Sequence, residues 1–406
     1  MTLRPKGLPV TALLTALVAL GPLSTDLYLP SLPGMARSFS APVAEIQLTM
    51  SVFLIGLALG QLAYGPLSDR FGRRPVLLVG LALYGLASLA CLLAPSIGLL
   101  IALRFLQALG ACAGPVICRA MVRDIHGRDS AARIYAYMGA AMALAPTLGP
   151  ILGGFLELWF GWRAAFAVMT LYGAAGLAVV ALALPETNAS PDPHAALPRH
   201  MLTNYLSLLG HRAYLGYVLC CTFAYGGIFA FISGSSFVLV ERIGLPPSAY
   251  GFCFAAVVLG YVIGTLGAGR LTRRLGVDRL ILAGSAIAAA SGLAMVAFAW
   301  NVAAGSRIAG ALSIVLPMLV YMIGIGLILP SALAGAIGPF PRRAGAASAL
   351  LGFTQMATAA ALGGIIGLLH DGTARPMVGA IALAAFVVLL AHRFLARAGG
   401  TALPPA

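Results

Sequence analysis

Residues 65–75 read GPLSDRFGRRP, and residues 269–276 read GRLTRRLG. The two glycines, a leucine and an arginine match at a constant offset, and the serine of the first copy is a threonine in the second. The offset is close to half the chain length, and each copy follows a long apolar run. The repeat therefore indicates two similar halves in the same orientation, an arrangement known in polytopic membrane proteins.

The composition around this repeat agrees with a membrane protein. Of the 406 residues, 61% are hydrophobic and only 9% are charged, whereas a soluble domain carries about 25% charged residues. A membrane span needs about 20 mostly apolar residues. The fold predicted is an all-α membrane protein with twelve transmembrane helices in two pseudo-symmetric six-helix halves. Its approximate spans are 8–30, 44–64, 75–94, 97–119, 131–156, 163–184, 213–240, 248–268, 279–299, 308–330, 344–369 and 376–396.

The loop charges predict the orientation. Nineteen of the 25 arginine and lysine residues fall in loops on one side and five on the other. Because positive loops stay in the cytoplasm, both termini are predicted to be cytoplasmic. The longest polar connection divides the chain near its middle. The predicted domains are residues 1–184, a cytoplasmic linker 185–212, and residues 213–406, and MLTNYLSLL at 201–209 suits a short surface helix.

Several other classes fit less well. The formal charge of +14 forms no stripe on one amphipathic face, so it does not indicate nucleic-acid binding. The six cysteines lie in or beside apolar runs without a metal-ligand spacing, so we expect buried thiols, no metal site and no disulfide framework. The basic and apolar N-terminus lacks a small-residue cleavage site and is interpreted as an uncleaved first helix. No motif for catalysis and no signalling domain is found, which argues against an enzyme or a sensor.

Two charges at membrane depth indicate a pathway. Asp26 lies in LVALGPLSTDLYLPSLP, and Arg104 is the only cation in the middle of a span. Charged groups in hydrocarbon are costly and usually face a partner or a water-filled cavity. The six histidines lie in loops or at span ends, so Asp26 is almost alone as a titratable carrier. Two alternatives remain. Asp26 could be neutralised by pairing with Arg104 or by a permanent proton, and Arg104 could be purely structural and bonded to helix carbonyls.

Two glycine motifs complete the pattern. In APTLGPILGG, Pro150 is expected to bend the helix, and small residues let a neighbouring helix pack closely. This seam comprises Pro146, Gly149, Pro150, Gly153 and Gly154. In the first repeat copy, Gly65 and Gly72 permit a tight turn. Asp69 can accept hydrogen bonds from a helix N-terminus and balance the adjacent arginines. This loop motif comprises Gly65, Asp69, Arg70, Gly72, Arg73 and Arg74.

With these motifs in register, the chain resembles the major facilitator superfamily over essentially its whole length. It looks most like the twelve-span drug:proton antiporters of the Bcr/CflA drug-resistance branch. The resemblance implies that the loop motif latches the cytoplasmic side, that Asp26 carries the proton and that Arg104 assists coupling. It also implies that the seam is typical of exporters. Arg273 stands where the second copy would repeat Asp69, so the latch is expected on one side only.

The implied function is proton-coupled efflux, by alternating access, of small amphipathic drugs such as phenicol- or bicyclomycin-like compounds. The alternative is a proton-coupled exporter of an endogenous metabolite or amino-acid derivative. The resemblance implies a monomer in the bacterial cytoplasmic membrane, with the proton as coupling ion and no cofactor. The candidate substrate-lining residues are Thr25, Asp26, Met50, Phe53, Met138, Met142, Pro146, Tyr225, Phe229, Ser233, Phe353 and Gln355. Ordinary helix packing is an equal alternative for each lining residue outside the first span.

Overall fold

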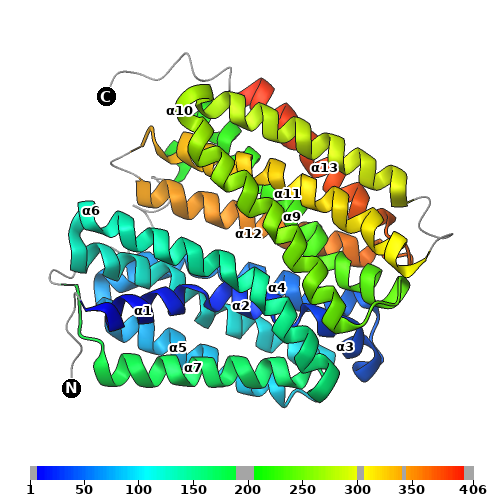
Figure 1. Ribbon diagram of the computed structural model, residues 1–406. Helices are drawn as coiled ribbons and strands as arrows, with labels where there is room; N and C mark the ends of the chain where they lie inside the picture. The colour runs from blue at the N-terminus through cyan, green and yellow to red at the C-terminus, as the bar shows by residue number, and fades with distance from the viewer. Residues whose placement is uncertain (1–6, 189–204, 300–305, 341–343, 397–406) are drawn as a thin grey trace. The chain divides into compact units, whose positions relative to one another are not determined.

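The computed structural model describes residues 7–188, 205–299, 306–340 and 344–396. In these ranges the chain is helical and contains no β-strand (Figure 1). Its contacts divide it into two compact units, one of residues 1–197 and 247–251 and the other of residues 198–246 and 252–406. Each unit has its own set of packed helices.

The first unit begins with a broken span. Its elements are α1 (Leu8–Val18), α2 (Leu20–Asp26), η1 (Leu29–Ser31), α3 (Leu32–Phe39), α4 (Val43–Phe71), α5 (Arg73–Leu92), α6 (Ile97–Phe160) and α7 (Arg163–Ala183). The single span predicted at 8–30 is wrong in this respect, because the chain bends by 43° between residues 9–18 and 20–39. Pro22 explains the break, since proline lacks an amide donor and its ring clashes with the carbonyl four residues earlier, at Val18.

Helix α6 contains two predicted spans without the loop expected between them. Its 64 residues are helical throughout, so the connection at 120–130 is helical and not the loop that was expected. A straight helix would place positions 119 and 142 about 35 Å apart. The structure instead brings Nη2 of Arg119 within 3.2 Å of Sδ of Met142. The helix therefore folds back on itself between these residues, and its two arms are separate spans.

The second unit contains the other helices. Its elements are α9 (Arg212–Ser236), the π-helix η2 (Phe237–Arg242), α10 (Pro247–Ala299), α11 (Arg307–Ile337), α12 (Ala344–Leu368), α13 (Arg375–Ala391) and the π-helix η5 (His392–Ala396). Helix α10 is two spans joined at Gly276, whose φ of 77° and ψ of 168° are not helical. Of the predicted surface helix, residues 205–209 are helical, and 201–204 lie outside the described residues.

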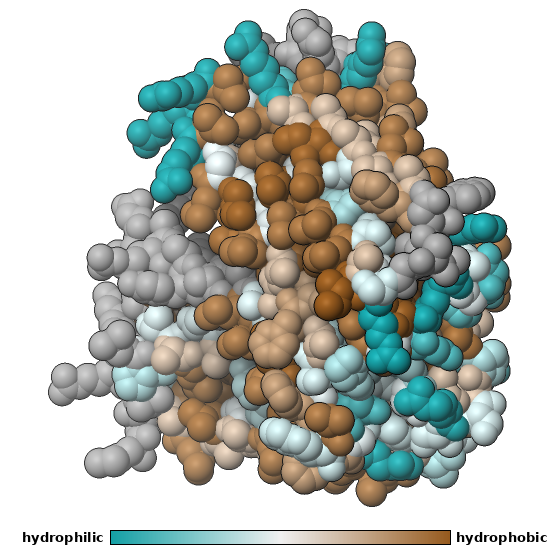
Figure 2. Space-filling model, turned by 45° about the vertical axis from the view of Figure 1, so that its right-hand side comes forward, coloured by the Kyte–Doolittle hydropathy of each residue, from teal (hydrophilic) through white to brown (hydrophobic). Residues whose placement is uncertain are grey.

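The helices suit a membrane. Nine described helices are long and apolar enough to cross it, and a tenth span forms if α1 and the helices after it are taken together. Counting both arms of α10 and the shorter apolar arm Leu144–Phe160 of α6 gives the twelve predicted spans. Large apolar side chains are exposed along them, among them Val79, Leu86 and Leu171. Figure 2 shows apolar residues over the middle of one face, with hydrophilic residues gathered towards its edges.

Candidate functional site

Asp26 ends helix α2 and is buried, with 3% of its surface exposed. The Thr25 hydroxyl donates to its Oδ1 at 3.2 Å. Among the described residues no cation forms an ion pair with this carboxylate. A buried carboxylate without a cation is costly in its charged form, so this acid is poorly compensated when it is ionised.

The glycine seam lies on the segment that carries Asp26. A Cβ atom placed on Gly149 would lie 3.1 Å from Cβ of Asp26, and one on Gly153 would lie 1.8 Å from the Leu27 carbonyl oxygen. Gly149 and Gly153 are one helical turn apart, so they present one face of α6 to this segment. Gly154 points elsewhere, towards the backbone of Pro247 and Ser248, which also belong to the first unit. The close packing predicted for the seam therefore has a specific neighbour, which is the acid-bearing segment.

Arg104 is fully buried in α6. Its Nη2 donates to the backbone carbonyl of Ser24 at 3.1 Å, and its Nη1 donates to Oε1 of Gln107. Its guanidinium carbon lies 4.4 Å from the ring centre of Tyr28 and 4.1 Å from that of Phe53. Arg104 is thus held by a helix carbonyl two residues before Asp26 and by aromatic faces, a favourable setting for a buried guanidinium.

A network of buried polar side chains supports Arg104. Nε2 of Gln107 donates to the Ser88 hydroxyl at 2.7 Å, and that hydroxyl donates to the Tyr84 carbonyl. The Tyr84 hydroxyl lies 2.8 Å from the hydroxyl of Ser24. Sequence reasoning missed Ser24, Tyr84 and Ser88. The only available signal was the spacing of Tyr84 and Ser88, which places both on one face of a span.

The first-unit candidates for substrate contact are mostly buried. Met50 and Phe53 have no exposed surface, and Met138 and Thr25 are nearly as buried. Phe53 contributes directly to the site, because its ring covers Arg104. The remaining two candidates of this unit are half-buried: Met142 and Pro146.

The second-unit candidates lie on α9 and α12. Phe229 and Ser233 are buried, while Tyr225 and Phe353 are half-buried. Gln355 is half-buried and donates from Nε2 to the carbonyl of Cys221 on α9 at 3.3 Å. This contact joins α12 to α9 at one of the predicted substrate-lining residues, Gln355.

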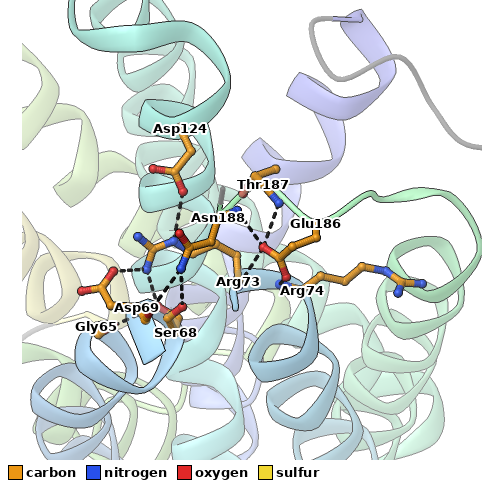
Figure 3. A network of polar contacts seen from close by, with 9 residues as sticks. All are labelled: Gly65, Ser68, Asp69, Arg73, Arg74, Asp124, Glu186, Thr187 and Asn188. Carbon is orange, nitrogen blue, oxygen red and sulfur yellow. Dashed lines mark hydrogen bonds and ion pairs between the residues drawn. The ribbon is translucent and has the colours of Figure 1, made fainter. Parts of the chain in front are cut away.

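The predicted latch is a polar network centred on Arg73 (Figure 3). Nη1 of Arg73 lies 2.5 Å from Oδ1 of Asp69 and donates to the Ser68 hydroxyl at 2.7 Å. Its Nε donates to Oδ2 of Asp124 at 3.0 Å. The Arg73 side chain is only 6% exposed, so these partners balance a nearly buried charge. Asp124 comes from α6 and was not predicted.

Two details of the latch prediction are wrong. Gly65 lies inside α4 rather than in a turn, and a Cβ there would meet nothing within 4 Å. Only Gly72 makes the turn, with φ of 95°. Asp69 balances a neighbouring arginine, as expected, by pairing with the Arg73 side chain, but it does not receive the first amides of the next helix, which donate to Glu186. Arg70 is exposed and lies over the ring of Phe71.

A buried acid, a fixed arginine and a charged turn between spans, in a duplicated twelve-span bundle, fit a multi-pass membrane transporter. The chain belongs to the Major Facilitator Superfamily, whose profile matches residues 14–368. The family predicted from the motifs is therefore confirmed, and the protein is a multi-pass membrane protein of a transporter family.

Similar proteins support the drug-resistance branch of the family. The chain is 33% identical to the chloramphenicol resistance protein of Pseudomonas aeruginosa, over 93% of this chain and 88% of that protein. It is 28% identical to the bicyclomycin resistance protein homolog of Haemophilus influenzae, over 93% of each. A D-xylose-proton symporter structure of 15% identity matches with a TM-score of 0.73 over 95% of this chain and 96% of that chain. At this identity the match shows the fold alone.

Proposed function

We propose that this chain is a proton-coupled exporter of small amphipathic drugs. Two relatives that align with 93% of it are named for resistance to bicyclomycin and chloramphenicol. The observation that carries the proposal is the setting of Asp26, which is buried and has no ion-pair partner among the described residues. Such a carboxylate is suited to bind a proton in one conformation and release it in another.

In the proposed cycle Asp26 takes up a proton when the site opens outward. The neutral acid no longer holds the polar or cationic part of a drug, so the drug leaves. The carrier then returns inward and releases the proton. One proton moving down 100 mV supplies about 2.3 kcal/mol, which supports roughly a 50-fold drug gradient.

Arg104 is proposed to link the position of the acid to the rest of the bundle. It bonds to the Ser24 carbonyl, so any shift of the Asp26 segment disturbs the guanidinium and its bond to Gln107. The aromatic ring of Phe53 covers Arg104 and is also a candidate drug contact. A drug that touches this ring would therefore act on the residue that holds the acid-bearing segment.

The finer assignments are part of the same proposal. The loop arginines support a bacterial cytoplasmic membrane location with both termini in the cytoplasm. We propose a monomer that uses the proton as its coupling ion and no cofactor. With one acid in the middle of a span, the expected substrates are neutral or monocationic.

Two measurements test the proposal. In a pump-deficient bacterial host, expression of the chain should raise resistance to phenicols or bicyclomycin at least fourfold over the empty vector. In inside-out vesicles, adding such a drug should release protons from the energised lumen. Resistance without proton release would contradict the coupling. Proton release driven by a metabolite and by none of the drugs would favour the metabolite exporter.

A further inference from the structure

The first residues after α7 lie across the turn between α4 and α5 (Figure 3). Oε1 of Glu186 accepts the backbone amide of Arg73 at 3.0 Å, and its Oε2 accepts that of Arg74 at 3.0 Å. These are the first two amides of α5, which have no partner within the helix. A carboxylate at this end also complements the helix dipole. Glu186 therefore caps α5 from a segment more than a hundred residues later in the chain.

Asn188 holds the other side of the same turn. Its Nδ2 donates to the Asp69 carbonyl at 3.0 Å and lies 3.5 Å from the Ser68 carbonyl, both in the last turn of α4. The backbone amides of Thr187 and Asn188 each donate to Oε1 of Glu186 at 2.8 Å. The carboxylate thus fixes the local turn that aims the asparagine. Residues 186–188 hold the end of one helix and the start of the next.

Gly72 shows how closely this segment, the linker clamp of residues 186–188, approaches the turn. A Cβ on Gly72 would lie 2.7 Å from Oε2 of Glu186, in addition to the strain of φ at 95°. The glycine of the loop motif therefore makes the turn and also leaves room for the Glu186 carboxylate.

The second unit has a different arrangement at the corresponding turn. Gly276 again has positive φ, but the acid, Asp278, lies on the helix that follows it. The Asp278 carboxylate accepts from the Tyr217 hydroxyl at 2.9 Å and lies 3.1 Å from Nε2 of His392, the first residue of η5. After Gly72, two helix amides donate to one carboxylate, Glu186, from the segment that follows α7. Within the described residues, no such carboxylate caps the helix after Gly276.

We propose that Glu186 and Asn188 are positioning residues of the latch. Glu186 fixes the Arg73 backbone, while Ser68, Asp69 and Asp124 hold its side chain. Formation of the latch is thereby coupled to the start of the linker, because a displacement of residues 186–188 would also displace Arg73. The transport part of this inference rests on the proposed export function, and the amide capping does not.

Hydrogen–deuterium exchange of the full chain in nanodiscs tests the capping directly. Glu186→Gln should speed exchange in peptides covering residues 70–78 about tenfold, since a charge-assisted cap of two amides is lost. Asn188→Ala should do so by a smaller factor. Glu241→Gln, which removes an exposed acid elsewhere, should leave these peptides unchanged. Unchanged exchange in Glu186→Gln would overturn the clamp, whether or not the chain transports drugs.

Drug-driven proton release tests the positioning role. In Glu186→Gln the turnover should fall about fivefold while KM changes less than twofold, because the clamp does not touch the Asp26 site. Unchanged turnover, or a parallel loss of turnover and drug binding, would overturn the positioning role. A wild-type protein without drug-driven proton release would instead refute the proposed function and leave the exchange result standing.

Discussion

Gly149 of α6 lies directly against Asp26 of α2: a Cβ on the glycine would come within 3.1 Å of the aspartate Cβ. Asp26, the residue most suited to carry a proton, therefore packs against the glycine face of α6. One turn further along, Gly153 meets the Leu27 carbonyl. The acid and the seam, separate motifs in the sequence, form one structural element that sets how closely α2 approaches α6.

This contact predicts a graded effect of alanine in the seam. Gly153→Ala forces a methyl group into the Leu27 backbone and should destabilise the protein by about 1–3 kcal/mol. It should also lower drug-driven proton release. Gly149→Ala meets mainly the Asp26 side chain and should cost less stability. Thermal unfolding in detergent and vesicle transport measure the two effects.

Gly98→Ala is the matched control, because it lies on the same helix with nothing near its Cβ position. It should be neutral or stabilise the helix by up to about 1 kcal/mol. The close-packing account fails if Gly153→Ala is as stable and active as Gly98→Ala.

We expect the Arg104→Lys variant to fold but to lose transport activity. A single ammonium group cannot reproduce the bonds to Gln107 and the Ser24 carbonyl together with stacking on Tyr28 and Phe53. Turnover should fall about tenfold or more, a loss of roughly 1.4 kcal/mol in transition-state stabilisation. The readout is turnover at saturating drug, with protein amount fixed by size-exclusion chromatography.

Arg393→Lys provides the control for this exchange, because Arg393 is exposed at the other end of the chain. Wild-type turnover is expected there. Full turnover in Arg104→Lys would show that neither the forked bonds nor the stacking matters for transport.

We expect substitutions of two neighbouring arginines, Arg73 and Arg70, to lower turnover by different amounts. Arg73 is nearly buried and has three side-chain partners, whereas Arg70 is exposed over Phe71. Arg73→Lys should therefore lower turnover about tenfold, and Arg70→Lys about twofold or less. Equal losses in the two variants would mean that positive charge in this loop matters, and not the Arg73 network.

The sequence was sufficient for the features that depend on local pattern. Apolar runs of about 20 residues predict spans because hydrocarbon requires them, and the Gly72 turn follows from the repeat. Local breaks were less visible: Pro22 stood in the predicted span 8–30, yet proline is often tolerated in membrane helices. The helical connection at 120–130 was also not visible in the sequence. Its polar residues indicated a loop, but they are helical in the structure.

Contacts between distant segments could not be predicted from spacing. The sequence placed Asp26 and Arg104 at membrane depth but left their pairing open. In the structure Arg104 bonds to the Ser24 carbonyl instead. The Glu186 cap and the partnership of Asp124 with Arg73 likewise depend on tertiary packing. The spacing of residues along a helix predicts contacts only between residues three or four positions apart.

The central claim is that Asp26 carries the transported proton. Asp26→Asn keeps the size of the side chain and its place against Gly149 but cannot exchange a proton. Drug-driven proton release should therefore be measured in inside-out vesicles containing wild-type or Asp26→Asn protein, beside drug exchange without a proton gradient. We predict that proton release is abolished in Asp26→Asn. Drug exchange should persist only at a higher drug concentration, because the neutral side chain holds the drug more weakly. Full proton-driven export by Asp26→Asn would contradict the account.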